Sequence, residues 1–206
     1  MWNGFFVGRS LWLELGYTLA GTIISFLLGS VAAIIAGLLF TTLPKVHNAA
    51  EPYLTFFNAM PRIALAPLFL LWFGLGIGSK IAVGTSLAFF IVLATTVAGM
   101  RSVSSDHLVL SKALGATAGQ VFFKVTLPSA VPMMFAGLRL GLIFSLLGVV
   151  GAELIAAEHG LGQTLDYLRS TFSMDGVMGL LLLLALLGLG VTALMNRIER
   201  ALLFWR

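Results

Sequence analysis

The sequence has 206 residues, of which 59% are hydrophobic and only 10% are charged. Soluble domains carry about 25% charged residues, so this composition excludes a soluble enzyme or a free binding module and points to lipid as the solvent. The absence of cysteine excludes disulfides, thiolate metal sites and a cysteine nucleophile. The net charge of +4 is small and does not indicate nucleic-acid binding.

Five stretches are apolar enough to cross a membrane, which needs about 20 residues of helix. Four of them are free of charged residues: 15–44, 63–79, 81–100 and 176–196, with 30, 17, 20 and 21 residues. A fifth span is predicted from about Pro132 to Ala157, with Arg139 close enough to one end to reach the interface and Glu153 near the other. The prediction is a single all-α domain over residues 1–206, a multi-pass transmembrane helical bundle with about five spans.

The first run is too long for a cleaved signal peptide and lacks a basic segment before it, so we expect it to remain as a span. The distribution of lysine and arginine predicts the orientation. Counting them in alternate loops places nine on one side and three on the other. The positive-inside rule assigns the side with nine, which includes the C-terminal Arg197, Arg200 and Arg206, to the cytoplasm. With five spans, the N-terminus is then expected outside.

Small residues recur at every fourth position of the first span. They are Gly21, Ser25, Gly29, Ala33 and Gly37. A shorter stripe of the same kind is Gly137, Gly141 and Ser145. Residues four apart share a helix face, and small ones allow close approach of another helix. We expect these stripes to serve packing within one subunit rather than a dimer contact.

Known catalytic and nucleotide-binding patterns are missing from the sequence. Residues 74–80 are rich in glycine, but Ser79 precedes Lys80 where a phosphate-binding loop needs the reverse order, so a turn between two spans is predicted. The three histidines have no metal-ligand spacing. We therefore expect no catalytic residue, no metal and no cofactor in this chain.

Glu153 is an acidic residue at the end of a predicted span. An intramembrane acid is often functional, but a carboxylate at the interface can equally be held by a neighbouring helix, and both interpretations stay open. Pro61, Pro67 and Glu153 are the candidates for the translocation path.

The segment 101–131 lies between two spans and carries helix signals. Ser104 to Asp106 can cap a first short helix, Gly115 ends it, and Thr117 with Gln120 forms a capping box for a second. Pro128 and Pro132 are expected to end that second helix. Two short amphipathic helices at the inner face suit a partner's groove, and with only Lys112 and Lys124 as cations they favour a protein partner over lipid.

This segment resembles the "EAA" loop of ABC importer permeases. The resemblance rests on Gly115, nine residues, then Val125-Thr-Leu127-Pro128, and continues through Pro132 and Gly137-Leu138-Arg139. The acidic triplet of the motif falls on Val109-Leu110-Ser111, so its glutamate is missing. Residues 59–74 and the stretch Gly151-Ala-Glu153-Leu-Ile with Gly160-Leu161-Gly162 are similar to the nitrate/sulfonate/taurine-type permeases. The resemblance covers roughly residues 15–206, and permeases of this type usually begin with one more span, so the chain is expected to start after it, as a natural short form or a truncated one.

The resemblance implies the fold of a type I ABC importer and a place in the cell (inner or cytoplasmic) membrane. It implies pairing with a second permease copy, expected as a homodimer, and docking of separate ATPase subunits that bind ATP on the inner face. An extracytoplasmic substrate-binding protein would deliver a small solute, such as a nitrate-, sulfonate- or taurine-like anion, for transport by alternating access. The docking residues implied are Ser111, Ala113, Gly115, Ala116, Thr117, Phe122, Val125, Leu127 and Pro128.

Two other classes stay open. An ATP-independent secondary transporter or channel predicts ionisable residues near mid-membrane, and the four charge-free runs contain none. A structural membrane scaffold predicts neither broken helices nor a polar cluster at the outer mouth, whereas Pro61, Pro67 and Glu153 suggest both.

Overall fold

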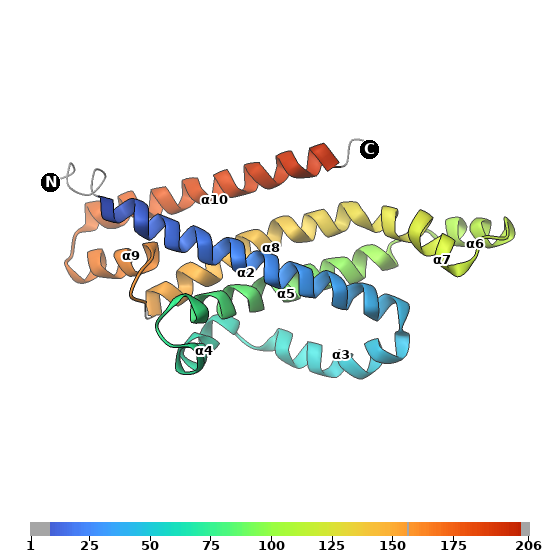
Figure 1. Cartoon of the computed structure of the whole chain (residues 1–206), viewed down its shortest axis with the longest axis horizontal. Helices are drawn as coiled ribbons and strands as arrows, with labels where there is room; N and C mark the ends of the chain where they lie inside the picture. Colours follow the sequence, from blue (N-terminus) through green and yellow to red (C-terminus); the bar gives the residue numbers. More distant parts are fainter. Residues whose placement is uncertain (1–8, 156, 203–206) are drawn as a thin grey trace.

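The computed structural model describes residues 9–155 and 157–202, and every regular element in these ranges is helical (Figure 1). In chain order they are α2 (Arg9–Thr42), α3 (Pro44–Ala59), the 3₁₀ turn η1 (Arg62–Leu65), α4 (Ala66–Phe73), α5 (Ile77–Arg101), α6 (Ser105–Ala113), α7 (Ala118–Val121), the π-helical turn η2 (Phe122–Thr126), α8 (Leu127–Ile155), α9 (Leu161–Ser170) and α10 (Met174–Leu202). Four helical stretches are long and apolar enough to cross a membrane, and a bent pair supplies a fifth. The predicted all-α bundle of about five spans is confirmed.

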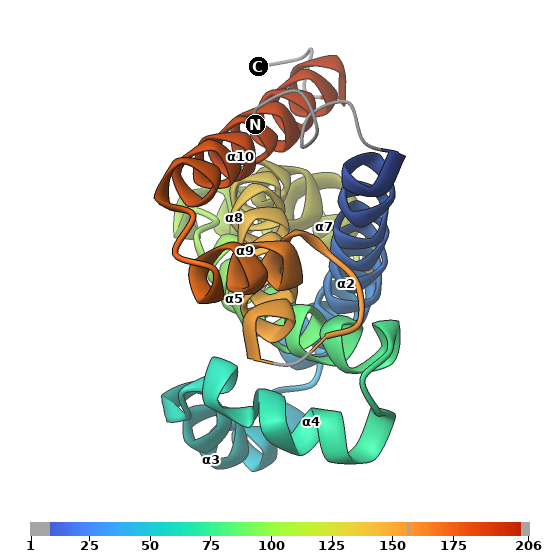
Figure 2. The same cartoon turned by 90° about the vertical axis from the view of Figure 1, so that its left-hand side faces the viewer.

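The core of the bundle is formed by α5 lying against both α2 and α8. Figure 2 looks along these helices and shows α10 on one side of them and α3 with α4 on the other. In Figure 1, α9 and the start of α2 lie at one end of the molecule, while α6 and α7 project from the opposite end. The two ends are called the α9 end and the α6 end below.

The two stripes of small residues pack inside the subunit, as predicted. A Cβ atom added at Gly29 of α2 would lie 2.9 Å from the Cβ of Ala88 in α5. One added at Gly141 of α8 would lie 2.6 Å from a methyl group of Val92 in α5. Both stripes thus let α2 and α8 approach α5 closely, which is how helices associate where lipid removes the usual hydrophobic driving force.

The bounds of the span expected at 63–79 are wrong, because these residues do not form one continuous helix. This part of the chain contains η1, the eight-residue α4 and the turn before α5, and the stretches Lys45–Ala59 and Arg62–Phe73 meet at 86°. Pro61 precedes the bend with extended backbone, and Gly74 ends α4 with φ +74°. An eight-residue helix is only about 12 Å long, so the second span is a broken one.

The expectation that Pro128 and Pro132 end a helix is also wrong. α8 begins at Leu127 and continues through Pro132 to Ile155. Pro128 lies in the first turn of α8, where a missing N–H costs little. The wider π-helical turn η2 comes directly before it, and membrane helices accommodate proline by such local adjustments.

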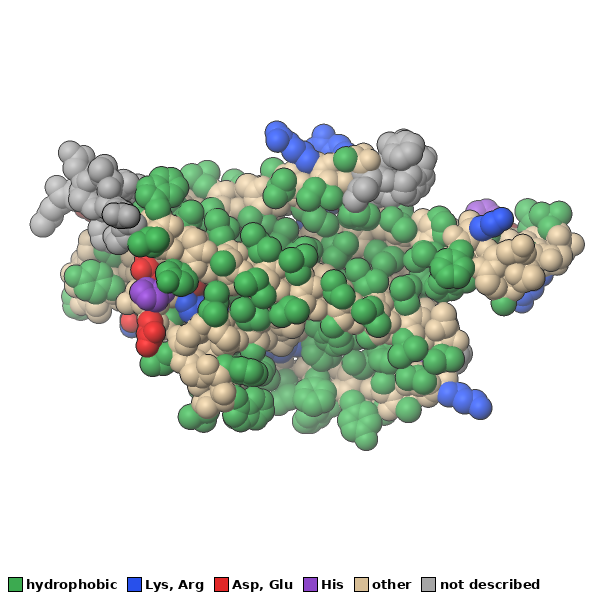
Figure 3. Space-filling model, in the orientation of Figure 1, with side chains coloured by type: hydrophobic (Ala, Val, Ile, Leu, Met, Phe, Trp, Pro, Cys, Tyr) green, Lys and Arg blue, Asp and Glu red, His purple; other side chains and the backbone are tan. Residues whose placement is uncertain are grey.

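Large apolar side chains cover the outside of the bundle. Leu182 and Leu186 of α10 and Ile23 and Leu27 of α2 are among those more than half exposed. Figure 3 shows apolar side chains across this face, with the visible acidic side chains at the α9 end. Such a surface belongs in contact with lipid. Arg139 pairs with Glu199, which ties α8 to α10.

Candidate functional site

Glu153 is the centre of a buried polar cluster at the α9 end. It lies in the last turn of α8 and is 1% exposed. The hydroxyl of Thr18 in α2 is 3.0 and 2.9 Å from its two carboxylate oxygens. The backbone N–H of Gly162 in α9 donates to Oε2 at 2.9 Å. Both oxygens are therefore occupied by donors from other helices in this conformation.

Lys80 is the cation of this cluster. Its ammonium is 3.4 Å from Glu153 Oε1 and also donates to the backbone carbonyl of His159. The sequence places Lys80 at the boundary of two apolar runs, as a loop residue. In the structure it lies in the first turn of α5 and is 2% exposed. A buried charge is tolerated only when it is paired and hydrogen-bonded, and both conditions are met here.

The connection between α8 and α9 closes over the cluster. The N–H of Leu161 donates to the Thr18 hydroxyl at 2.9 Å, and the N–H of Gly160 donates to the carboxylate of Glu14. The His159 ring stacks on Tyr17 with centroids 4.7 Å apart. Its Nδ1 is 3.3 Å from Glu14. The start of α2 is thus fastened to the start of α9.

The Gly160-Leu161-Gly162 sequence has a steric cause. Gly160 has φ +122°, a conformation that disfavours any residue with a Cβ. A Cβ added at Gly162 would lie 2.5 Å from the Cβ of Glu153 and 2.7 Å from the carbonyl oxygen of Val150. Glycine at both positions lets the backbone of the connection reach the carboxylate.

The three candidates for the translocation path differ in exposure. Pro61 and Pro67 are exposed, whereas Glu153 is buried, so the three do not line a shared surface in this conformation. Ala66, next to Pro67, packs in one cluster with Ala152, next to Glu153. The broken span therefore touches the end of α8 through its apolar side. A role of the three residues in translocation stays a prediction.

The segment at the α6 end is built from local hydrogen bonds. Thr117 caps α7, and the Gln120 side chain accepts from the Thr117 N–H at 2.8 Å, so the predicted capping box is confirmed. Gly115, predicted to end the first helix, has φ +77°. Its N–H bonds the carbonyl of Lys112, and the N–H of Ala116 bonds that of Ser111, both at 3.0 Å. This pattern is a Schellman ending for α6.

The docking residues implied by the resemblance divide into three sets. Phe122 and Leu127 pack against buried Met100, Ala130 and Met134, and so anchor the segment to the bundle. Four others are exposed: Ala113, Gly115, Thr117 and Pro128. The remaining three, Ser111, Ala116 and Val125, are half-buried. We call residues 105–126 the coupling segment.

Several large apolar side chains of the coupling segment also face outward. Val109 is 66% exposed, Leu114 78% and Phe123 67%. Because the segment projects from the end of the bundle (Figure 1), these side chains are presented beyond the ends of the spans. Sequence reasoning did not select Val109 or Phe123, although an apolar residue at a helix face pointing away from its own core is a sign of a partner surface.

Comparison with known proteins identifies the class of protein. Residues 25–204 match the family model of the binding-protein-dependent transport system inner membrane component. The chain belongs to this family. A formylaminopyrimidine transport permease, ThiX of Halalkalibacterium halodurans, is 35% identical over 92% of this chain and 76% of that protein. The taurine transport system permease TauC of Escherichia coli is 31% identical over 94% of this chain and 72% of its own length.

Solved structures show the same fold. The inward-facing MetNI methionine ABC transporter contains a chain that superposes with a TM-score of 0.78 at 25% identity, over 94% of this chain and 96% of that one. The family and its apolar helices make this a multi-pass membrane protein of a transport system. The resemblance to ABC permeases drawn from the EAA-like loop is confirmed.

In this binding-protein-dependent permease, the residues that sequence reasoning missed are those of the Glu153 cluster. Thr18, Lys80 and Gly162 come from three different helices and meet only in the fold. The only sign in the sequence was the Gly160-Leu161-Gly162 stretch, which followed Glu153 in the resemblance.

Proposed function

We propose that this chain is the permease subunit of an ATP-driven ABC importer and that separate ATPase subunits dock on its coupling segment. The observation that carries the proposal is the capped and exposed coupling segment at one end of a membrane bundle. ATP is bound by the partner, so the chain transmits energy and carries no catalytic residue of its own. Coupling requires that the ATPase bind one conformation of the permease better than the other.

The orientation proposed puts the α6 end in the cytoplasm. Arg101, Lys112 and Lys124 belong to that end, and the excess of lysine and arginine marks the cytoplasmic side. The Glu153 cluster then lies on the outer side of the cell (inner) membrane, where a substrate-binding protein would dock. A second copy of the permease completes the transport path.

The Glu153 cluster bears on the ATP-independent alternative. A secondary transporter places its coupling residues near the middle of the membrane. Lys80 and Glu153 are a buried ion pair, but they lie in the first turn of α5 and the last turn of α8. Both are hydrogen-bonded to neighbouring helices. Their position and these bonds favour a structural clamp rather than a proton or ion site.

The substrate proposed is a small solute of the kind named for the relatives. Among these are the taurine permease TauC and a sulfonate permease, SsuC of Bacillus subtilis, 32% identical over 89% of this chain. A small sulfonate-like anion is therefore the first ligand to test in a transport assay.

The test of docking is a pull-down of the ATPase by permease variants. Gly115→Asp adds an unpaired charge at the proposed interface, which costs about 3–5 kcal/mol when buried and weakens binding a hundredfold or more. Leu114→Asp makes the same charge change at an exposed residue without positive φ. Both variants should insert in the membrane, lose the ATPase and stop transport.

The matched control is Gly115→Ala. It carries the same backbone strain at φ +77° without a charge, and a Cβ there meets nothing within 4 Å. We expect it to retain the ATPase. If both Asp variants retain the ATPase and transport normally, or if the lone chain transports in vesicles without ATP, the ABC proposal is wrong.

A further inference from the structure

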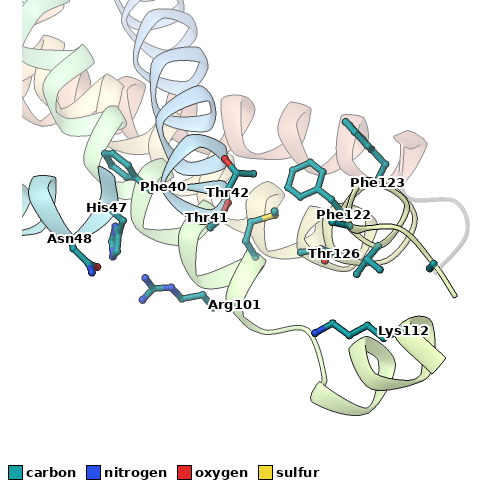
Figure 4. Close-up of a pocket in the computed structure, with 15 residues that line it drawn as sticks. Phe40, Thr41, Thr42, His47, Asn48, Arg101, Lys112, Phe122, Phe123 and Thr126 are labelled. Atoms are coloured by element: carbon teal, nitrogen blue, oxygen red, sulfur yellow. The ribbon is translucent and has the colours of Figure 1, made fainter. Parts of the chain in front are cut away.

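The coupling segment and the ends of the spans enclose a pocket at the α6 end. The pocket has a volume of about 880 Å³ and is lined by residues from the ends of α2 and α5, the start of α3 and the coupling segment. Figure 4 shows the rings of Phe40 and Phe122 along one edge and the charged ends of Arg101 and Lys112 along the opposite edge. Its lining therefore combines an aromatic side with a cationic side.

The two cations of the pocket have no counterion within the described part of the chain. No ion pair or side-chain hydrogen bond joins Arg101 or Lys112 to another described residue, and no carboxylate lines the pocket. Both side chains are exposed. Two cations that face one space without an acid favour an anion in that space.

His47 adds a second observation that points to a ligand. It lines the same pocket, and its ring lies 5.6 Å from that of Phe40. Its Nδ1 atom is buried and has no hydrogen-bond partner among the described residues. Buried polar atoms are nearly always hydrogen-bonded, so this nitrogen is an unsatisfied polar group beside the pocket.

The place of the pocket identifies the kind of anion. α2 ends at Thr42 and α5 at Arg101, and both helix ends border the pocket. In a spanning bundle the headgroups of the lipids lie at this level, and basic pockets between helix ends bind anionic headgroups. The apolar residues Phe40, Met100 and Phe122 of the lining suit the first carbons of acyl chains.

We infer that this pocket binds an anionic phospholipid, with its phosphate between Arg101 and Lys112 and its acyl chains along the aromatic side. The sequence alone favoured a protein partner here, because Lys112 and Lys124 are the only cations of the predicted helices. The structure instead brings Lys112 of α6 together with Arg101 of α5, while Lys124 does not line the pocket. A bound lipid would bridge α5 and the coupling segment, so the ATPase would dock on a segment whose position depends on lipid.

The experiment measures lipid binding to the full chain without any ATPase, so it stands independently of the docking test above. The purified permease is delipidated in detergent and titrated with phosphatidylglycerol or phosphatidylcholine, with bound lipid counted by native mass spectrometry. We expect phosphatidylglycerol to bind at least about tenfold more tightly. Arg101→Gln with Lys112→Gln should weaken that lipid about thirtyfold and leave phosphatidylcholine unchanged.

The matched control is Lys45→Gln with Lys124→Gln, which removes the same charge from exposed residues outside the pocket. It should change phosphatidylglycerol binding by no more than about twofold. Photoreactive phosphatidylglycerol should label residues 118–126 in the wild type and lose that label in the pocket variant.

Three results would overturn the inference. The first is an equal loss of phosphatidylglycerol in the pocket variant and the control. The second is displacement of the lipid by soluble glycerol phosphate at similar concentration, which would make the pocket a site for free phosphate. The third is a pocket variant that keeps phosphatidylglycerol but loses the ATPase, which would make the two cations part of the protein interface.

Discussion

The hydrogen bonds at the α9 end join residues that are far apart in sequence, while those at the α6 end join neighbours. Thr18 and Glu153 are 135 positions apart, and Glu14 and Gly160 are 146 apart. In the coupling segment, Ser111 bonds a residue five positions away, and Thr117 and Gln120 are three apart. One end is a buried clamp between four helices, and the other is a locally folded segment that presents its surface.

In the proposed orientation, this difference suits a permease whose outer helix ends are held together while its inner segment meets a partner. Loss of a buried ion pair should loosen the whole bundle, since no local structure replaces it. Loss of the Thr117 cap should increase local unfolding of only a few residues, because a segment can open locally without unfolding of the whole bundle. The following substitutions test that contrast, from the largest expected effect to the smallest.

Lys80→Met should produce the largest loss of stability. It leaves the Glu153 carboxylate buried without its cation, which costs about 3–5 kcal/mol. The measurement is thermal unfolding of the purified chain in detergent. Adding Glu153→Gln to this variant removes the orphaned charge and should recover at least half of the loss.

Lys124→Met is the control for Lys80→Met, because Lys124 is exposed and lies in the coupling segment. A surface change of this kind costs no more than about 0.5 kcal/mol. Equal effects of Lys80→Met and Lys124→Met would show that the cluster does not clamp the bundle.

Gly162→Ala should have an intermediate effect. The added Cβ meets Glu153 and Val150 at 2.5 and 2.7 Å, and overpacking of this kind costs about 1–3 kcal/mol. Gly119→Ala makes the same change in α7, where a Cβ meets nothing within 4 Å. It should be neutral or slightly stabilising in the same unfolding measurement. A Gly162→Ala variant as stable as Gly119→Ala would contradict the close approach of α9 to α8.

Thr117→Ala should have the smallest and most local effect. It removes the side chain that caps α7, which costs about 1 kcal/mol. Hydrogen exchange should rise in residues 118–121, while the unfolding temperature of the bundle stays the same. Thr117→Ser keeps a capping hydroxyl and should exchange like the wild type. A fall in the unfolding temperature of Thr117→Ala would show that the segment is part of the core.

The contrast between the two ends also explains what could be predicted from the sequence. The Thr117 capping box and the turn at Gly115 are short-range patterns with a known geometry, so they were found in advance. The packing stripes were equally readable, because helical periodicity alone sets which small residues share a face. The break was only partly predicted: Pro61 and Pro67 suggested a broken helix, but counting apolar residues put a span at 63–79 and did not place the 86° bend next to Pro61.

The partners of Glu153 could not be predicted in the same way. Lys80 lies between two apolar runs, and its position in a first helical turn rather than in a loop depends on where α5 begins. Thr18 is one of several hydroxyl residues in an apolar helix. Only the packing of α2, α5 and α8 brings these side chains to one carboxylate, and no spacing in the chain encodes that meeting.

The central claim is that the coupling segment receives the ATPase while the Glu153 cluster remains a fixed clamp. Hydrogen exchange of the full permease, with and without its ATPase subunit, tests both parts at once. The account predicts slower exchange in residues 105–126 when the ATPase binds and unchanged, slow exchange in residues 150–155 and 161–165. Unchanged exchange in the coupling segment of a complex that has formed, or protection confined to the α9 end, would contradict it.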